Sequence, residues 1–184
     1  MNSLIFATID ITPEQWTDFV KTAGIPPPTG SDEDPRAPYI LVHSPSQQTL
    51  ERTQKIEEPV HSKFSTSPTW DELKSAFTNL SSTDPRHIHP IVFLILDHQS
   101  FEDRSVVIIQ KGAEFVNTDG EKRHPLPDNE KDLTQMVVWR KYRAPFEAAW
   151  TVQCGIDGFC GMEKAEKHFV EEVQREVDAG DAED

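Results

Sequence analysis

The sequence predicts a single α/β domain in which a mixed β-sheet is flanked by helices, with an α+β arrangement as the alternative class. The first observation is a pair of charge-free runs rich in isoleucine and valine, Ile91–Leu96 and Val106–Ile109. Such short apolar runs are typical of strands buried on both faces. The second is an N-terminal order of strand, tight turn and helix, as in an α/β unit. The third is the length of 184 residues, which suits one domain that buries roughly 70% of its unfolded surface.

The N-terminal segment combines a strand pattern with a complete helix-start signal. Leu4–Ile9 is apolar and is the expected first strand. Thr12 is a favourable N-cap, Pro13 fits the first helical position, and Gln15 completes a capping box. Gly24 is expected to end this helix as its C′ glycine.

The next segment is mostly irregular in its pattern. Ile25–Pro35 is rich in proline and acidic residues, so we interpret it as a surface connector, with a proline-rich peptide ligand as the less favoured alternative. Tyr39–Val42 is predicted to be a second strand. Ser46–Glu58 has a weak helical pattern, and His61–Thr66 is a candidate short strand.

A second helix is expected to begin at Ser67, which is a favourable N-cap, with Pro68 at the first helical position. Asp71 and Glu72 would complement the helix dipole in the first turn. The predicted buried stripe of this helix consists of Trp70, Leu73 and Phe77.

In the C-terminal third, polar segments alternate with segments in which apolar residues recur at regular spacing. Asn117–Asp132 is a polar loop and Gln135–Arg143 a strand, and Pro145 opens a short helix. After a glycine-rich bend, the spacing of apolar residues from Ala165 to Val177 predicts a last helix. The single domain is therefore expected to span residues 1–177, followed by an acidic, disordered tail, Asp178–Asp184.

Composition excludes several functional classes. The formal net charge of −14 argues against nucleic acid and against an anionic membrane surface as partners. No apolar run approaches the roughly 20 residues of a spanning helix, and the N-terminus lacks the basic region of a signal peptide. Two cysteines are too few for a disulfide scaffold. These observations predict a soluble, cytoplasmic protein.

Five stretches of the chain follow one another in a recognisable order. They are Leu4–Ile9 with Thr8, Asp10 and Trp16, the helix start Thr69–Leu73, the strand Pro90–Asp97, the strand Ser105–Ile109, and the arginine-bearing strand, helix and bend that follow. This order resembles a small family of bacterial and fungal α/β proteins that is catalogued only as a domain of unknown function. The resemblance implies a compact α/β domain and assigns no catalytic residue. The proline-rich connector and the polar loop are departures, as is the absence of an asparagine from the bend Gly158–Met162.

The densest set of titratable groups follows the strand Ile91–Leu96. Asp97 and His98 come directly after it, and Glu102, Asp103 and Arg104 are close behind. In open α/β sheets, ligands bind at the carboxyl ends of the strands. An acid and an imidazole placed there could exchange a proton. The alternative is a polar turn in which Asp97 caps local amides.

A second candidate is a cationic patch of Arg140, Lys141 and Arg143 just before the helix opened by Pro145. Arginines beside a helix N-terminus can hold a carboxylate or phosphate. The alternative is that these residues pair with the acidic groups of the chain itself.

No metal site is expected. His87 and His89 could supply two ligands from one side of a strand, and Cys154, Cys160 and His168 could supply others. The cysteines, however, lack the short spacing of zinc sites. A disulfide between them is disfavoured in a reducing compartment.

Signatures of serine hydrolases, phosphate-binding loops and dinucleotide-binding proteins are absent from the sequence. We therefore predict a cofactor-independent enzyme that acts on a small organic substrate by acid–base chemistry, as an isomerase, cyclase or lyase. The alternative is a non-catalytic module that binds a protein partner through its acidic surface. The predicted site consists of Asp97 and His98 as acid or base, Arg140 and Arg143 as anion-holding groups, and Trp139 and Trp150 as walls of the pocket.

Overall fold

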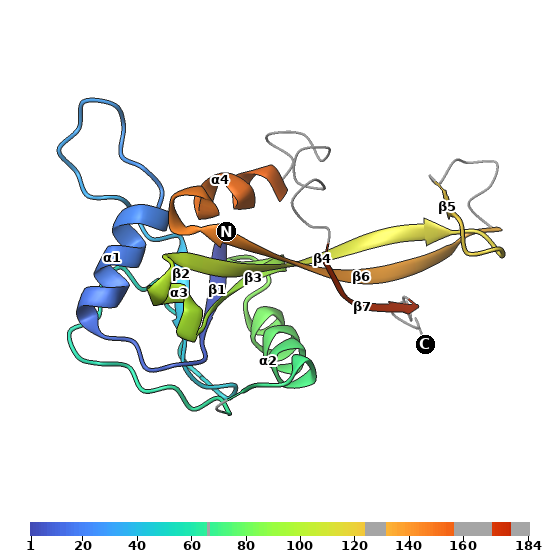
Figure 1. Ribbon diagram of the computed structural model, residues 1–184, viewed down its shortest axis with the longest axis horizontal. Helices are drawn as coiled ribbons and strands as arrows, with labels where there is room; N and C mark the ends of the chain where they lie inside the picture. Colours follow the sequence, from blue (N-terminus) through green and yellow to red (C-terminus); the bar gives the residue numbers. More distant parts are fainter. Residues whose placement is uncertain (66, 124–131, 157–170, 178–184) are drawn as a thin grey trace.

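A single mixed β-sheet organises the computed structural model, which describes residues 1–65, 67–123, 132–156 and 171–177 (Figure 1). Its seven strands follow the order β2-β1-β3-β4-β6-β7, and β5 pairs with β4 outside this path. The predicted α/β class is confirmed. The strands are β1 (Asn2–Ala7), β2 (Tyr39–Val42), β3 (Ile88–Leu96), β4 (Ser105–Val116), β5 (Lys122–Arg123), β6 (Thr134–Pro145) and β7 (Glu171–Val177). The helices of the described residues are α1 (Pro13–Ala23), α2 (Trp70–Thr83), α3 (His98–Glu102) and α4 (Phe146–Ile156).

The sheet has a parallel half and an antiparallel half. β1 lies between β2 and β3 and is parallel to both, whereas β4, β6 and β7 continue the sheet antiparallel. Helices cover both faces (Figure 1). On β1, Ile5 packs in the core under α1 and α4, and the next residue, Phe6, packs in the core under α2. Both faces of the central strands are therefore buried, as their apolar runs predicted.

The start of α1 matches the predicted capping box. The Thr12 side chain accepts a hydrogen bond from the Gln15 backbone, and the Gln15 side chain accepts one from the Thr12 backbone. Gly24 does end the helix, but as its C-cap with φ −74°, so it needs no left-handed backbone. A Cβ at this position would lie 2.5 Å from the carbonyl oxygen of Val20 and 3.0 Å from that of Arg36. Glycine is required there by close backbone approach.

The proline-rich connector is closed at its base. The backbones of Ile25 and Arg36 exchange two hydrogen bonds, of 2.8 and 3.0 Å. The residues between them form the long loop beside α1 in Figure 1.

Helix α2 begins two residues later than predicted. Its N-cap is Thr69, whose hydroxyl accepts a hydrogen bond from the backbone of Glu72 at 3.2 Å. Ser67 and Thr69 are both favourable caps, and Pro68 lies before the cap instead of in the first turn. The acidic residues Asp71 and Glu72 occupy the first turn, as expected.

The segment Ser46–Glu58 is not helical, and the described part of His61–Thr66 contains no strand. The segment Ser46–Glu58 instead covers the free edge of β2. The Thr53 hydroxyl accepts a hydrogen bond from the backbone of Leu41, and the Gln47 amide donates one to the Leu41 carbonyl. Side chains thus satisfy polar groups that an edge strand would otherwise expose.

Strand β4 extends well beyond its predicted run, Val106–Ile109, whereas β6 differs from the predicted strand Gln135–Arg143 by only one residue at its start and two at its end. They form an antiparallel ladder from Ser105 opposite Pro145 to Val116 opposite Thr134, and they project from the body of the molecule as a long ribbon (Figure 1). The end of this ribbon carries β5, which lies within the predicted polar loop, Asn117–Asp132. Residues 124–131 of that loop lie outside the described residues.

The predicted last helix is wrong for Glu171–Val177, which forms strand β7 on the edge of β6. Val173 and Val177 are four residues apart, and this spacing places two side chains on one face of either a helix or a strand. The sequence pattern could not separate the two. The remainder of the predicted helix, much of the bend before it and the acidic tail lie outside the described residues.

A buried polar network joins four elements of the core. The Tyr39 hydroxyl donates to the Ala23 carbonyl at 2.5 Å, and the Gln153 amide donates to the Tyr39 oxygen at 3.0 Å. The Ser3 hydroxyl donates to the Gln153 carbonyl oxygen at 2.8 Å. Burial raises the pKa of Tyr39 far above its ordinary value, so its hydroxyl remains a donor. The network satisfies each of these buried side chains and fixes α4 against β1 and β2.

Candidate functional site

The topology creates a crevice at one edge of the sheet. The chain leaves β1 through α1 toward β2 on one side and leaves β3 through α3 toward β4 on the other. Because β1 and β3 are parallel neighbours, their carboxyl ends lie at the same edge and their following loops diverge. Ligands of open α/β sheets bind at such a switch point. Thr8, just after β1, is tied to the end of β3 by a backbone hydrogen bond of 3.0 Å to the Leu96 carbonyl.

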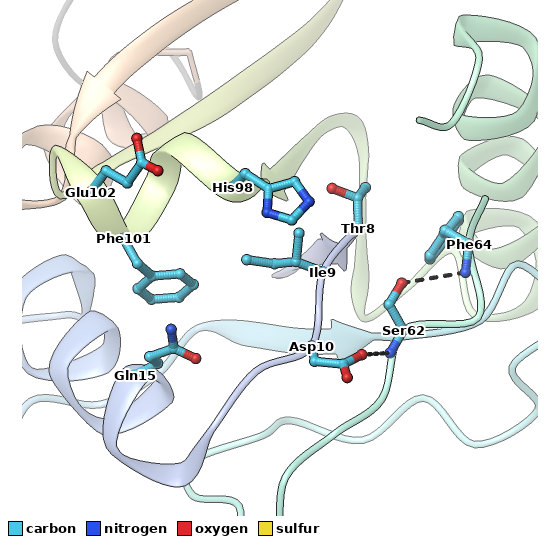
Figure 2. Close-up of a pocket in the computed structure, with 9 residues that line it drawn as sticks. All are labelled: Thr8, Ile9, Asp10, Gln15, Ser62, Phe64, His98, Phe101 and Glu102. Atoms are coloured by element: carbon cyan, nitrogen blue, oxygen red, sulfur yellow. Dashed lines mark hydrogen bonds between the residues drawn. The ribbon is translucent and has the colours of Figure 1, made fainter. Parts of the chain in front are cut away.

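A hollow of about 630 Å³ occupies this switch point. Small-molecule sites generally enclose roughly 300–1,000 Å³. The residues after β1 and the loop that contains Ser62 form one side, and α3 forms the other (Figure 2). The lining residues are Thr8, Ile9, Asp10, Gln15, Ser62, Phe64, His98, Phe101 and Glu102.

Asp10 is the central charged group on the β1 side. One of its carboxylate oxygens lies 2.8 Å from Nδ1 of His61, and the other accepts a hydrogen bond of 2.9 Å from the backbone of Ser62. These two contacts hold the pKa of Asp10 below its ordinary value, with the His61 hydrogen bond as the larger cause. The Ser62 hydroxyl donates to the carbonyl of Ala7 at 2.7 Å, which ties the loop to the end of β1.

Helix α3 places His98 in the crevice. Its N-cap is Asp97, which accepts hydrogen bonds of 3.0 Å from the backbone and the hydroxyl of Ser100. His98 is the first helical residue, its imidazole is exposed, and it lines the hollow together with Phe101 and Glu102 (Figure 2). The crevice therefore combines an imidazole, carboxylates, hydroxyl groups and apolar walls.

Asp97 itself does not line the hollow. Its second carboxylate oxygen forms an ion pair with Arg143 of β6. Arg143 also donates a hydrogen bond of 2.9 Å to the Ser105 hydroxyl, which in turn donates to Asp103. Both carboxylate oxygens of Asp97 are thus engaged in holding α3 and the neighbouring strands together.

The other predicted site residues are spread over the molecule. Arg140 pairs with Glu114 on the ribbon of β4 and β6. Trp139 is 2% exposed within the core beneath α2, and its ring centroid lies 5.3 Å from that of Trp70. Trp150 lies half-buried on α4. None of these residues, nor Arg143, lines the switch-point hollow, and of the predicted set only His98 does.

Sequence reasoning did not select the residues on the β1 side of the crevice. Asp10 directly follows the first predicted strand, Leu4–Ile9, so the rule that pointed to Asp97 and His98 applied to it as well. Thr8 was placed inside that strand, whereas β1 ends at Ala7. Ser62 carried no comparable signal, because it lies in an irregular segment that only the tertiary structure brings to the strand ends.

The metal candidates within the described residues, His87, His89 and Cys154, are not brought together as a set. His87 contacts the neighbouring Asp84 at 2.9 Å, at the opposite end of β3 from the crevice. Within the described residues, no three histidine, cysteine or acidic side chains are close enough to hold a metal ion. Cys160 and His168, and with Cys160 the possible disulfide, lie outside those residues.

Comparison of the chain with protein-family models, with curated proteins and with solved structures gave no match. None of the helices in the described ranges has the length and apolar character needed to cross a membrane.

Proposed function

We propose that the protein is a cofactor-independent enzyme that binds a small organic molecule in the switch-point crevice and acts on it by acid–base chemistry through His98. The observation that carries this proposal is the position of an exposed imidazole inside a hollow of about 630 Å³ at the divergence of β1 and β3. Ligands of open α/β sheets bind at the carboxyl ends of the strands and in concave sites of this size, and the hollow meets both conditions.

His98 is a better acid–base candidate than Asp97. The imidazole is the side chain that exchanges protons most readily near neutral pH, and no hydrogen-bond partner of His98 has been identified among the described residues. One carboxylate oxygen of Asp97 caps α3, and the other forms an ion pair with Arg143. In this proposal Asp97 positions His98, and only His98 meets the substrate.

The proposed chemistry needs no co-reactant. His98 would accept a proton from one atom of the substrate and return it to another, which leaves the composition of the substrate unchanged in an isomerisation or cyclisation. An elimination would instead divide one molecule into two. Asp10 lies on the β1 side of the crevice and would hold a polar group of the substrate during the transfer.

The test is conversion of a metabolite mixture by the full chain, followed by mass spectrometry and NMR. We expect one compound to disappear and a product of equal mass, or two products of the same summed mass, to form. His98→Gln should lower the rate by about 10²–10⁴, the usual contribution of a general acid or base. No conversion, or equal conversion by the variant, would contradict the proposal.

The alternative, a non-catalytic module that binds a protein partner through its acidic surface, has less support. Protein interfaces are centred on apolar side chains. Among the large apolar residues of the described ranges, only Met1 and Val177 are exposed.

A further inference from the structure

We infer that the ligand of the switch-point crevice is a small organic cation, with a protonated amine carried on an apolar or aromatic body. This inference rests on the proposed location of the ligand site. It concerns the chemical class of the ligand and does not depend on the reaction.

The charge of the crevice supports a cation. Its lining includes the carboxylates of Asp10 and Glu102, and no lysine or arginine. The hydrogen bonds from His61 and Ser62 keep Asp10 ionised. The whole chain carries a formal charge of −14, so the long-range field also attracts cations and repels anions.

The hydrogen-bonding capacity of the crevice points the same way. The hydroxyl of Thr8 donates its single hydrogen to the Leu96 carbonyl at 3.1 Å. The hydroxyl of Ser62 donates its own to the Ala7 carbonyl at 2.7 Å and accepts a hydrogen bond of 3.3 Å from the backbone of Phe64, which leaves one lone pair on its oxygen. Both oxygens can therefore only accept from a ligand. Each oxygen of Asp10 has one partner and retains a lone pair. An ammonium group carries three donors and no acceptor, which matches this set of acceptors.

Gln15 adds a donor at the edge of the site, besides the ring N–H of His98. Its carbonyl oxygen accepts from the backbone of Thr12 at 2.9 Å, which leaves the amide nitrogen, drawn toward Phe101 in Figure 2, as its remaining polar group. That nitrogen suits a neutral acceptor elsewhere on the ligand, such as an ether or carbonyl oxygen.

The walls of the crevice favour an organic cation over a metal ion. Phe64, Phe101 and Ile9 supply apolar surface, and aromatic faces attract alkylammonium groups. The lining holds two carboxylates, Asp10 on the β1 side and Glu102 on α3, and no set of three metal-ligating side chains is found in the described ranges.

Three phenyl compounds of similar size and different charge test the inference: benzylamine, benzyl alcohol and benzoate. Each is titrated into the full-length ¹⁵N-labelled protein at neutral pH, and amide shifts are followed at Thr8–Asp10, Ser62 and His98–Glu102. We expect saturable shifts with benzylamine, at least about tenfold weaker binding of benzyl alcohol, and no saturable shifts with benzoate.

Variants identify the charged contacts. Asp10→Asn and Glu102→Gln should each weaken benzylamine binding several-fold and leave benzyl alcohol unchanged. Asp32→Asn removes the same unit of charge from the exposed connector and should leave both unchanged. Glu102→Gln keeps the test valid if Asp10→Asn alters the loop through its lost contact with His61.

The outcomes separate this inference from the proposed function. Benzoate or benzyl alcohol binding at least as tightly as benzylamine would overturn the cation while leaving the crevice as a ligand site. No shift at the crevice with any probe would overturn the inference and remove the support for the site. Selective amine binding by a protein without activity would support the inference and contradict the proposed enzyme.

Discussion

The carboxylate of Asp97, at the end of β3, forms an ion pair with the guanidinium of Arg143 on β6. These residues are 46 positions apart in the chain, and their contact spans β4, which lies between the two strands. The same carboxylate caps α3, the helix that carries His98. The ion pair therefore fixes the position of the candidate catalytic imidazole without either partner lining the crevice.

Asp97→Asn tests this positioning role. Asparagine is as good an N-cap as aspartate, so the variant should keep the cap and lose only the charge opposite Arg143. We expect a loss of about 0.2–1 kcal/mol in the free energy of unfolding and nearly normal turnover. Chemical denaturation and the activity assay measure the two effects. A variant of normal stability that has lost 10²-fold or more of its activity would return Asp97 to a catalytic role.

Arg104 offers a test of backbone strain. It is the only non-glycine residue with positive φ in the described ranges, at 55°, and its side chain contacts Asp18 and Thr22. Arg104→Ala and Arg104→Gly both remove these contacts, but only glycine accepts this backbone without strain. We expect Arg104→Gly to be about 1 kcal/mol more stable than Arg104→Ala in urea unfolding. Equal stabilities would mean that the turn after α3 relaxes to another conformation.

The buried network around Gln153 predicts a non-additive pair of substitutions. Gln153→Leu leaves the Ser3 hydroxyl without its acceptor in the core, which should cost about 1–3 kcal/mol. Adding Ser3→Ala removes that hydroxyl, so the double variant should be less unstable than the sum of the two single variants. Additive losses in the double-mutant cycle would show that the contact contributes no coupling energy.

The lowered pKa of Glu114 leads us to expect that stability depends on pH. Burial raises the pKa of Glu114, but the hydrogen bond from Lys122 and the charges of Arg140, Lys122 and Arg175 outweigh it, so the pKa is below its ordinary value. Such a group stabilises the fold above its unfolded pKa, near about 4.3, and this contribution is lost as the pH falls through the folded pKa. The difference in unfolding free energy between the wild type and Glu114→Gln should therefore shrink below about pH 4. A difference that is constant from pH 7 to pH 3 would contradict the assignment.

The sequence predicted those features that depend on local chemistry. The capping box of Thr12 and Gln15, the strand Tyr39–Val42 and the central runs of β3 and β4 all lie where their patterns indicated. The rule for strand ends also led to His98. Features that depend on contacts between residues far apart in the sequence were not predicted.

Two predictions show why. Glu171–Val177 has a spacing that suits a helix or a strand, and the available edge of β6 decides between them. Asp97 looked catalytic because its partner, Arg143, is far away in the sequence and becomes its neighbour only when β6 joins the sheet. All three residues of the cationic patch, Arg140, Lys141 and Arg143, pair instead with carboxylates of the chain itself.

The most direct test of the central claim is deuterium uptake by candidate amine substrates in D₂O, because proton transfer by His98 would exchange a carbon-bound hydrogen of the substrate. The full chain, His98→Gln and Asp97→Asn are compared by mass spectrometry after their folds are verified. We predict a one-unit mass increase in a substrate or its product with the wild type, a rate about 10²–10⁴ lower with His98→Gln, and a nearly normal rate with Asp97→Asn. Uptake by His98→Gln at the wild-type rate, or no uptake from any amine that binds the crevice, would contradict acid–base catalysis at this site.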